Sequence, residues 1–176
     1  MPNSKSNAAL ELHALGNAYA VFRGQRLHLS QRQLEILCIL ALHPEGLSLA
    51  DLHHALCRNV ATTRPTTIRT MLTALRHLLD GQIGSHPYRL LIPVWTDFRA
   101  LSDRLEQHDI AAALALYRGA LLPLSMAPAL VEYRYYLDAG MDDLLRTCTS
   151  AQLLIDNADN LLCTPLVRER LLALLA

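Results

Sequence analysis

The 176-residue sequence has little charge, few aromatic residues and no long apolar run. Only 18% of the residues are charged and 5% are aromatic, whereas 52% are hydrophobic. This composition excludes a disordered chain, and its abundance of Leu favours packed helices over a β-sandwich. The longest apolar runs, 34–42 and 111–116, are far shorter than the roughly 20 residues of a membrane span. We therefore expect no membrane partner.

Signals for secretion and for catalysis are also missing. The first ten residues contain one Lys and no apolar segment, so a secretory signal is not expected and a cytoplasmic protein is predicted. The sequence has no Gly-rich phosphate loop, no HExxH and no GxSxG. Asp142 and Asp143 are adjacent on a predicted helix, so their carboxylates face different directions. These absences predict a protein that is not an enzyme and has no cofactor.

The four cysteines are too far apart for a CxxC motif. They are Cys38, Cys57, Cys148 and Cys163. We interpret them as buried or half-buried free thiols. The alternative is a metal site formed by His53, His54 and Cys57, but this spacing matches no common zinc pattern, so no metal is expected.

The formal net charge is zero, but the charge is unevenly distributed. Residues 1–96 carry nine basic and five acidic residues, a net charge of +4, and residues 97–176 carry seven and eleven, a net charge of −4. Between Arg58 and Arg89 there are five Arg and one acid, Asp80. Such asymmetry indicates two units with different partners, and the local Arg supply suits phosphate contact. The alternative is a solvated basic face without a partner.

An amphipathic helix is predicted within residues 62–81. Its apolar positions, Ile68, Leu72, Leu75 and Leu79, recur at steps of four, three and four. The opposite stripe contains hydrogen-bond donors and no carboxylate: Thr66, Arg69, Thr70, Thr73, Arg76 and His77. Pro65 suits the first turn, Thr62 or Thr63 is available as a cap, and Gly81 should end the helix.

A short β-hairpin should follow this helix. Ile83, Tyr88, Leu90 and Ile92 are its expected strand residues, and 84–87 forms the turn region. A helix with a polar, cationic face followed by a β-ribbon is typical of a winged helix-turn-helix.

Three strands and two helices are predicted before the amphipathic helix. Alternating apolar residues separated by Gly-containing turns predict strands over 10–15, 18–23 and 26–29. Ser30 should cap an apolar helix, with Gln33 completing a capping box. Ser48 should cap a short helix over 49–57, and Leu47-Ser48 can form an edge strand or an extended link. The resulting order is β-β-β-α-α-α-β-β.

The second half should be all-α. Helices are predicted over 97–107, 109–118, 128–147, 152–157 and 166–175, with short connections typical of helical hairpins. The fold class is therefore α+β. The predicted division is a disordered tail over 1–8, a winged-helix unit over 9–95 and an all-helical unit over 96–176.

The first unit resembles the OmpR/PhoB-type winged-helix DNA-binding domain of actinobacterial regulators. The matching pieces are Leu15-Gly16, 24–30, 42–46, 49–56, Leu75-Arg76 and 88–90. One departure is Ala74, at a position that is often basic in that family. The resemblance implies a double-stranded DNA partner.

The second unit resembles the tetratricopeptide-like bacterial transcriptional activator domain of antibiotic-regulatory-type activators. The match is carried by 117–119, 121–123 and 132–137, and the two resemblances together cover roughly residues 10–145. They imply a transcriptional regulator whose helical unit contacts RNA polymerase, a sensor protein or another partner. A homodimer is one form that this resemblance allows.

A winged helix inserts its third helix into the major groove, which is about 12 Å wide. The expected groove-facing residues are Arg69, Thr73, Arg76 and His77, with Thr66, Thr67 and Thr70 as donors to phosphate or base edges and Arg64 near phosphate at the helix start. His86 and Arg89 belong to the wing. Two alternatives are an exposed polar face without a ligand and a winged helix that binds protein instead of DNA.

Overall fold

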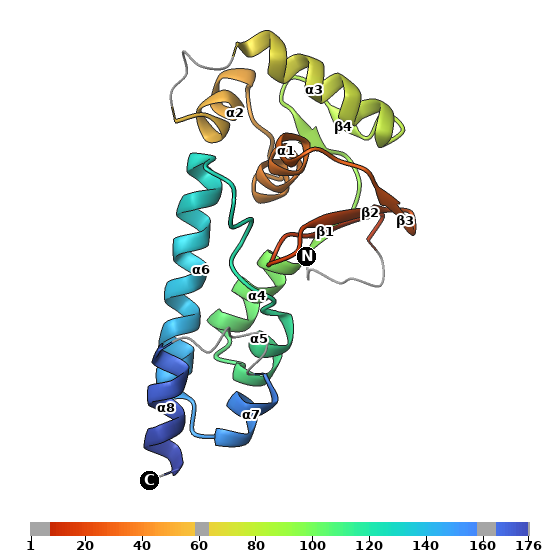
Figure 1. The fold of residues 1–176 in the computed structure, drawn as a ribbon. Helices are drawn as coiled ribbons and strands as arrows, with labels where there is room; N and C mark the ends of the chain where they lie inside the picture. Colours follow the sequence, from red (N-terminus) through yellow and green to blue (C-terminus); the bar gives the residue numbers. More distant parts are fainter. Residues whose placement is uncertain (1–7, 59–63, 158–164, 176) are drawn as a thin grey trace.

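The computed structural model describes residues 8–58, 64–157 and 165–175. The predicted tail therefore lies, apart from Ala8, outside the described residues. Figure 1 shows an elongated molecule, with α3 at one end, α7 and α8 at the other, and α6 along one side.

A four-stranded sheet has the order β3-β2-β1-β6. Its members are β1 (Leu10–His13), β2 (Tyr19–Phe22), β3 (Gln25–Leu27) and β6 (Val94–Thr96). The first three strands are antiparallel, as predicted, but shorter than expected. The fourth, β6, was not predicted because three residues are too short for a periodic signal, and it pairs parallel to β1.

Three helices follow the first three strands: α1 (Gln31–Leu42), α2 (Leu49–Leu56) and α3 (Pro65–Leu78). The predicted capping box at Ser30 is confirmed, because its hydroxyl accepts from Gln33 N and Gln33 Oε1 accepts from Ser30 N. The predicted cap at Ser48 is also confirmed.

The predicted hairpin consists of β4 (Ile83–Gly84) and β5 (Arg89–Leu90). Tyr88 forms an isolated antiparallel bridge with Leu47, with N–H···O distances of 2.9 and 2.8 Å. The element order over residues 10–90 is thus β-β-β-α-α-α-β-β.

The remaining described helices are α4 (Asp97–Glu106), α5 (Ile110–Leu116), α6 (Pro128–Thr147), α7 (Ala151–Asp156) and α8 (Pro165–Leu175). Their bounds lie within two residues of those predicted. Gly140 is a close-packing position in α6. A Cβ there would lie 2.8 Å from Leu105 Cδ1, so the missing side chain lets α6 approach α4.

The buried apolar side chains of the described residues, apart from that of Trp95, form one cluster. It includes Leu12 and Ile36 from the first half together with Phe98 and Leu137 from the second. The division at 95/96 stays a prediction, but the two halves share this core. Cys38, Cys57 and Cys148 are buried free thiols, as interpreted, and burial raises the pKa of Cys38 well above its usual value. Cys163 lies outside the described residues.

No helix in the described part of the chain is both long enough and apolar enough to cross a membrane.

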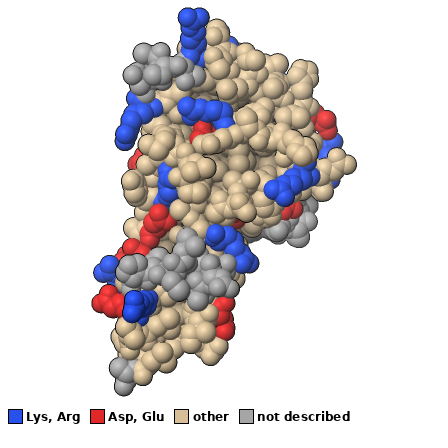
Figure 2. Space-filling view, in the orientation of Figure 1, with Lys and Arg blue, Asp and Glu red and all other residues tan. Residues whose placement is uncertain are grey.

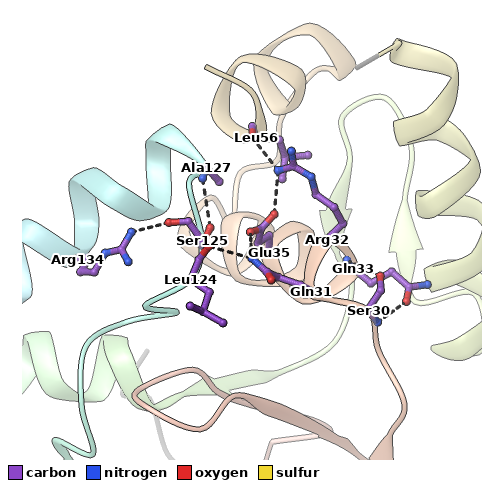
Figure 3. A network of polar contacts seen from close by, with 10 residues as sticks. All are labelled: Ser30, Gln31, Arg32, Gln33, Glu35, Leu56, Leu124, Ser125, Ala127 and Arg134. Carbon is purple, nitrogen blue, oxygen red and sulfur yellow. Dashed lines mark hydrogen bonds and ion pairs between the residues drawn. The ribbon is translucent and has the colours of Figure 1, made fainter. Parts of the chain in front are cut away.

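A polar network connects α1 to α2 and to the loop before α6 (Figure 3). The buried carboxylate of Glu35 accepts from Gln31 Nε2 at 3.1 Å and from Arg32 Nη1 at 2.9 Å. Gln31 also donates to Leu124 O and Arg32 also donates to Leu56 O. One buried carboxylate therefore holds two side chains that each reach another segment.

Arg134 of α6 fixes the same loop from the other side. Its guanidinium donates to the carbonyl oxygens of Leu122, Pro123 and Ser125 at 3.1, 2.9 and 2.7 Å. Bonds to backbone carbonyls fix the path of the loop independently of its side chains, so the exposed Leu124 projects from a backbone that is held in place.

The two halves meet at residues 14–16. Asp97, the first residue of α4, accepts from Ala14 N at 2.9 Å through both oxygens and from Leu15 N at 3.0 Å. Gly16 N donates to Ala120 O at 3.0 Å. Burial raises the pKa of Asp97 above its usual value, although the backbone N–H groups of residues 14 and 15 favour the charged form.

Replacing Asp97 by Ala should lower the free energy of unfolding by about 2–4 kcal/mol, because two buried N–H groups lose their acceptor. Urea denaturation monitored by circular dichroism measures this change. The matched control is Asp103→Ala, an exposed carboxylate on the same helix, for which a change within about 0.5 kcal/mol is expected. Equal losses in the two variants would contradict the role assigned to Asp97.

Candidate nucleic-acid interface

The amphipathic character predicted for α3 is observed. Ile68, Leu72 and Leu75 are buried at 1%, 1% and 0% exposure, and Leu79, just after the helix, is at 0%. The side chains expected on the opposite face are exposed with one exception. The exposed set is Arg64, Thr66, Thr67, Arg69, Thr70, Thr73 and His77.

The start of α3 has no side-chain cap. Arg64 occupies the N-cap position and Pro65 the first turn, as predicted for the proline. The expected caps Thr62 and Thr63 lie outside the described residues. Among the described residues no side chain accepts from the first turn of α3, Thr67 N donates to Arg64 O at 2.9 Å, and the exposed Arg64 lies at this helix start. Such an end favours an anion.

Two of the threonines already use their hydroxyl protons within the helix. Thr70 Oγ1 donates to Thr66 O at 3.0 Å and Thr73 Oγ1 donates to Arg69 O at 2.9 Å. Each hydroxyl keeps its acceptor lone pairs. Donation to a phosphate would require the hydroxyl proton to turn away from the helix carbonyl, which breaks this hydrogen bond. The expectation that they act as donors stays a prediction.

Arg76 is the exception to the exposed set. Its side chain is half-buried, and Nε donates to Ile83 O at 2.8 Å. Nη2 is buried and has no hydrogen-bond partner within the described part of the chain. The guanidinium therefore bends towards β4 instead of standing out along the helix face, which differs from the groove-facing position expected from the sequence. It ties the end of α3 to the hairpin.

The backbone reverses directly after α3. Gly81 has a φ of +81° and its N–H donates to Arg76 O at 2.7 Å, consistent with its predicted role as the helix stop. The one acidic residue near this end, Asp80, pairs with Arg23 Nη1 at 2.7 Å. Both side chains are 59% exposed, so the pair contributes little to stability.

The predicted wing residues lie on the hairpin beside α3. His86 and Arg89 are both exposed, and Arg89 pairs in register with Gly84. Ile83 is buried at 2% and anchors the hairpin, whereas the large apolar side chains of Leu78 and Leu91 are 40% and 52% exposed nearby in the sequence. The candidate interface thus combines cations with some apolar surface.

The sequence-based set omitted the exposed Arg58, which comes six residues before Arg64 in the sequence. Arg58 follows α2 and is exposed. Its position in the Arg-rich run 58–89 could have identified it, from the sequence alone, as a candidate DNA-binding residue. Figure 2 shows that Lys and Arg stand apart from one another on the visible face, and that most of this face is uncharged.

Comparison with known proteins supports the fold. No protein-family model matches the sequence. Over 163 residues the chain is 34% identical to the uncharacterized 47.3 kDa protein in the thcA 5′ region of Rhodococcus erythropolis, a match covering 92% of this chain and 35% of that protein. The chain therefore spans about a third of this relative.

Among solved structures, the chain is similar to Mycobacterium tuberculosis EmbR in complex with a low-affinity phosphopeptide. The alignment covers 95% of this chain and 54% of EmbR, with a TM-score of 0.52 and 19% identity. At this identity the likeness concerns the fold, which in the described residues is a mixed α/β arrangement of eight helices and a small sheet.

The contrast between Arg76 and Arg69 is testable by stability alone. Arg76→Ala should lower the free energy of unfolding by about 1–3 kcal/mol, because Ile83 O loses a charged donor. Arg69→Ala removes an exposed side chain from the same helix and should change it by less than about 0.5 kcal/mol. Thermal and urea denaturation measure both. If the two variants lost equal stability, Arg76 would not connect α3 to the hairpin.

Proposed function

We propose that this protein is a sequence-specific DNA-binding transcriptional regulator of the winged-helix type, acting in the cytoplasm without enzymatic activity. In this proposal α3 enters the major groove, the β4–β5 hairpin is the wing, and the helical half contacts RNA polymerase or another protein. The observation that carries it is the outer face of α3, where Arg64, Arg69 and His77 are exposed and no acid occurs from residue 64 to residue 79.

Further features support the proposal. The element order over residues 10–90 is the one expected from the sequence for a winged helix, the first unit resembles the OmpR/PhoB-type domain, and the fold is similar to that of EmbR. The N-terminus of α3, which no described side chain caps, suits a backbone phosphate. Arg64 adds a forked donor beside it.

Within this proposal the arginines have different tasks. Arg69 lies in the middle of the exposed face and is the groove contact, whereas Arg64 neutralises phosphate at the helix start. Arg76 holds the hairpin to the helix, so that both elements reach the duplex in a fixed relation. His86 and Arg89 then contact the neighbouring backbone or minor groove.

The second candidate is a protein-interaction module in which this surface binds a protein. The zero net charge, the exposed Leu78 and Leu91, and the inward hydroxyl protons of Thr70 and Thr73 favour it. The dependence of binding on salt separates the candidates, since binding to duplex DNA releases counterions in proportion to the phosphates contacted.

The experiment selects duplexes from a random library and measures affinity by fluorescence anisotropy over a series of salt concentrations. Arg64→Ala should weaken binding and reduce the slope of log K against log salt by about 0.9, the value for one lost phosphate contact. Arg69→Ala should weaken binding and relax the sequence preference with the slope retained, and a reduced slope would instead identify Arg69 as a phosphate contact.

The matched control is Arg168→Ala, an exposed arginine on α8, which should change neither affinity nor slope. If the library yields no enriched sequence and binding is absent at about 50 mM salt, where phosphate contacts are strong, the DNA proposal is wrong and the interaction module is favoured.

A further inference from the structure

One edge of the four-stranded sheet is formed by β3. The strand order β3-β2-β1-β6 places β3 at the end of the sheet, and Figure 1 shows it on the side remote from α6. Within the described part of the chain, no further strand or backbone hydrogen bond closes this edge. The backbone N–H and C=O groups of an open edge are a template for pairing with another chain.

The turn before β3 determines which of its backbone groups point outward. Arg23 and Gly24 have φ values of +48° and +81°, as in the two-residue turn that favours a β-hairpin. Phe22 and Gln25 pair across this turn and form its hydrogen bond. Hydrogen-bonded and non-bonded pairs alternate along an antiparallel ladder, so the N–H and C=O groups of Arg26 point away from β2.

The side chains along this edge alternate between the two faces of the sheet. Leu27 pairs with the buried Ala20 and therefore lies on the core side, whereas Arg26 lies on the opposite face. His28 is exposed like Arg26, and Leu29 is half-buried against the core like Leu27. Leu27 and Leu29 are only partly covered because no strand lies beyond them in the described chain.

A hollow of about 430 Å³ lies against this edge. Its apolar lining includes Leu27, Leu29 and the buried Leu34 of α1, and its polar lining includes Arg26 and His28. None of the described residues that line it is acidic. The edge therefore combines an apolar floor with a cation.

Arg26 is held in place but has no acidic partner. Its guanidinium carbon lies over the Tyr19 ring, 4.5 Å from the centroid. A guanidinium in this position still has N–H donors for a carboxylate, because it has five of them in a planar fork. Arg23, on the same hairpin, instead pairs with Asp80 at 2.7 Å. Within the described chain, Arg26 thus remains available for a carboxylate from outside.

We propose that the open edge of β3 binds an extended segment of a partner protein in which acidic and apolar residues alternate. The segment adds to the sheet as a further strand and exchanges backbone hydrogen bonds with Arg26. Its acidic side chains lie on the face of Arg26 and His28. Its apolar side chains lie on the other face, where they cover Leu27 and Leu29 and enter the hollow.

The charge of Arg26 favours an acidic partner over a second copy of this chain. Pairing of two β3 strands would bring two Arg26 side chains together, and like charges across a ladder are destabilising. A short strand that carries a charge is a common protection of an open edge against such self-pairing. An acidic segment turns the same charge into an attraction. No residue that lines the hollow belongs to α3 or to the β4–β5 hairpin, so this proposal is independent of DNA binding.

The probe is a phage-displayed library of random peptides, selected on the full chain. We expect enriched sequences in which Asp or Glu alternates with Leu, Ile or Val. Fluorescence anisotropy of a labelled synthetic copy then measures affinity. Arg26→Glu should weaken binding about tenfold or more, because opposite charges become like charges, and Arg26→Gln should weaken it less.

The matched control is Arg168→Glu, the same charge reversal at an exposed position of α8, which should leave the affinity unchanged. Circular dichroism of each variant checks that the fold is retained. Equal losses in Arg26→Glu and Arg168→Glu would show that the peptide responds to net charge and not to this edge.

Modified peptides test strand addition without altering the protein. In an added strand the N–H groups of every second residue point to the sheet. N-methylation of one alternate set of peptide residues should therefore abolish binding, whereas methylation of the intervening set should leave it intact. Equal tolerance of both sets would contradict strand addition.

Two further outcomes would overturn the proposal. The first is a selection that enriches no peptide, or only peptides without acidic residues. The second is a dimer of the chain alone in sedimentation experiments that the selected peptide dissociates, which would identify a second copy as the occupant of the edge.

Discussion

The arrangement of the whole molecule depends on a place where two backbones touch. A Cβ at Gly16 would lie 2.3 Å from Arg118 O, and a Cβ at Gly119 would lie 3.1 Å from Gly16 Cα, so neither position has room for a side chain. Leu122 N donates to Ala14 O at 2.9 Å in the same region. Because this contact fixes the segment after α5 against the end of β1, it also determines where α6 begins and allows α6 to pack on α1 and α2.

At the opposite end, α3 has one face in the core and one face that packs against nothing in the described chain. Its inner leucines secure the helix to α1 and α2, so the outer face contributes little to stability and is available for recognition. Arg76 is the exception on this face, because its guanidinium donates a hydrogen bond to the hairpin and so contributes to stability. On this face, the last turn of α3 therefore both stabilises the fold and belongs to the candidate interface. The first two turns belong to the candidate interface alone.

The elements could be predicted from the sequence where the residues that determine them are neighbours along the chain. The capping box at Ser30, the apolar spacing of α3 and the hairpin around residues 84–87 all follow from neighbouring residues, and each is observed. The sequence was insufficient where the partner lies far along the chain. The contact between Gly16 and Gly119 was not predicted, β6 was missed, and Arg76 was placed outward because nothing nearby in the sequence indicates that Ile83 O accepts from it. The exposed part of the candidate DNA-binding surface stays a prediction, since exposure alone does not identify a ligand.

The parallel pairing of β6 with β1 has a kinetic consequence. Leu10 pairs with Val94, so β1 lacks one of its two neighbours until residues 94–96 have been synthesised. Contacts of such sequence separation form slowly, because a long loop must close before they contribute. During synthesis one edge of β1 is therefore open to pairing with other chains, and the arrival of residues 94–96 closes it.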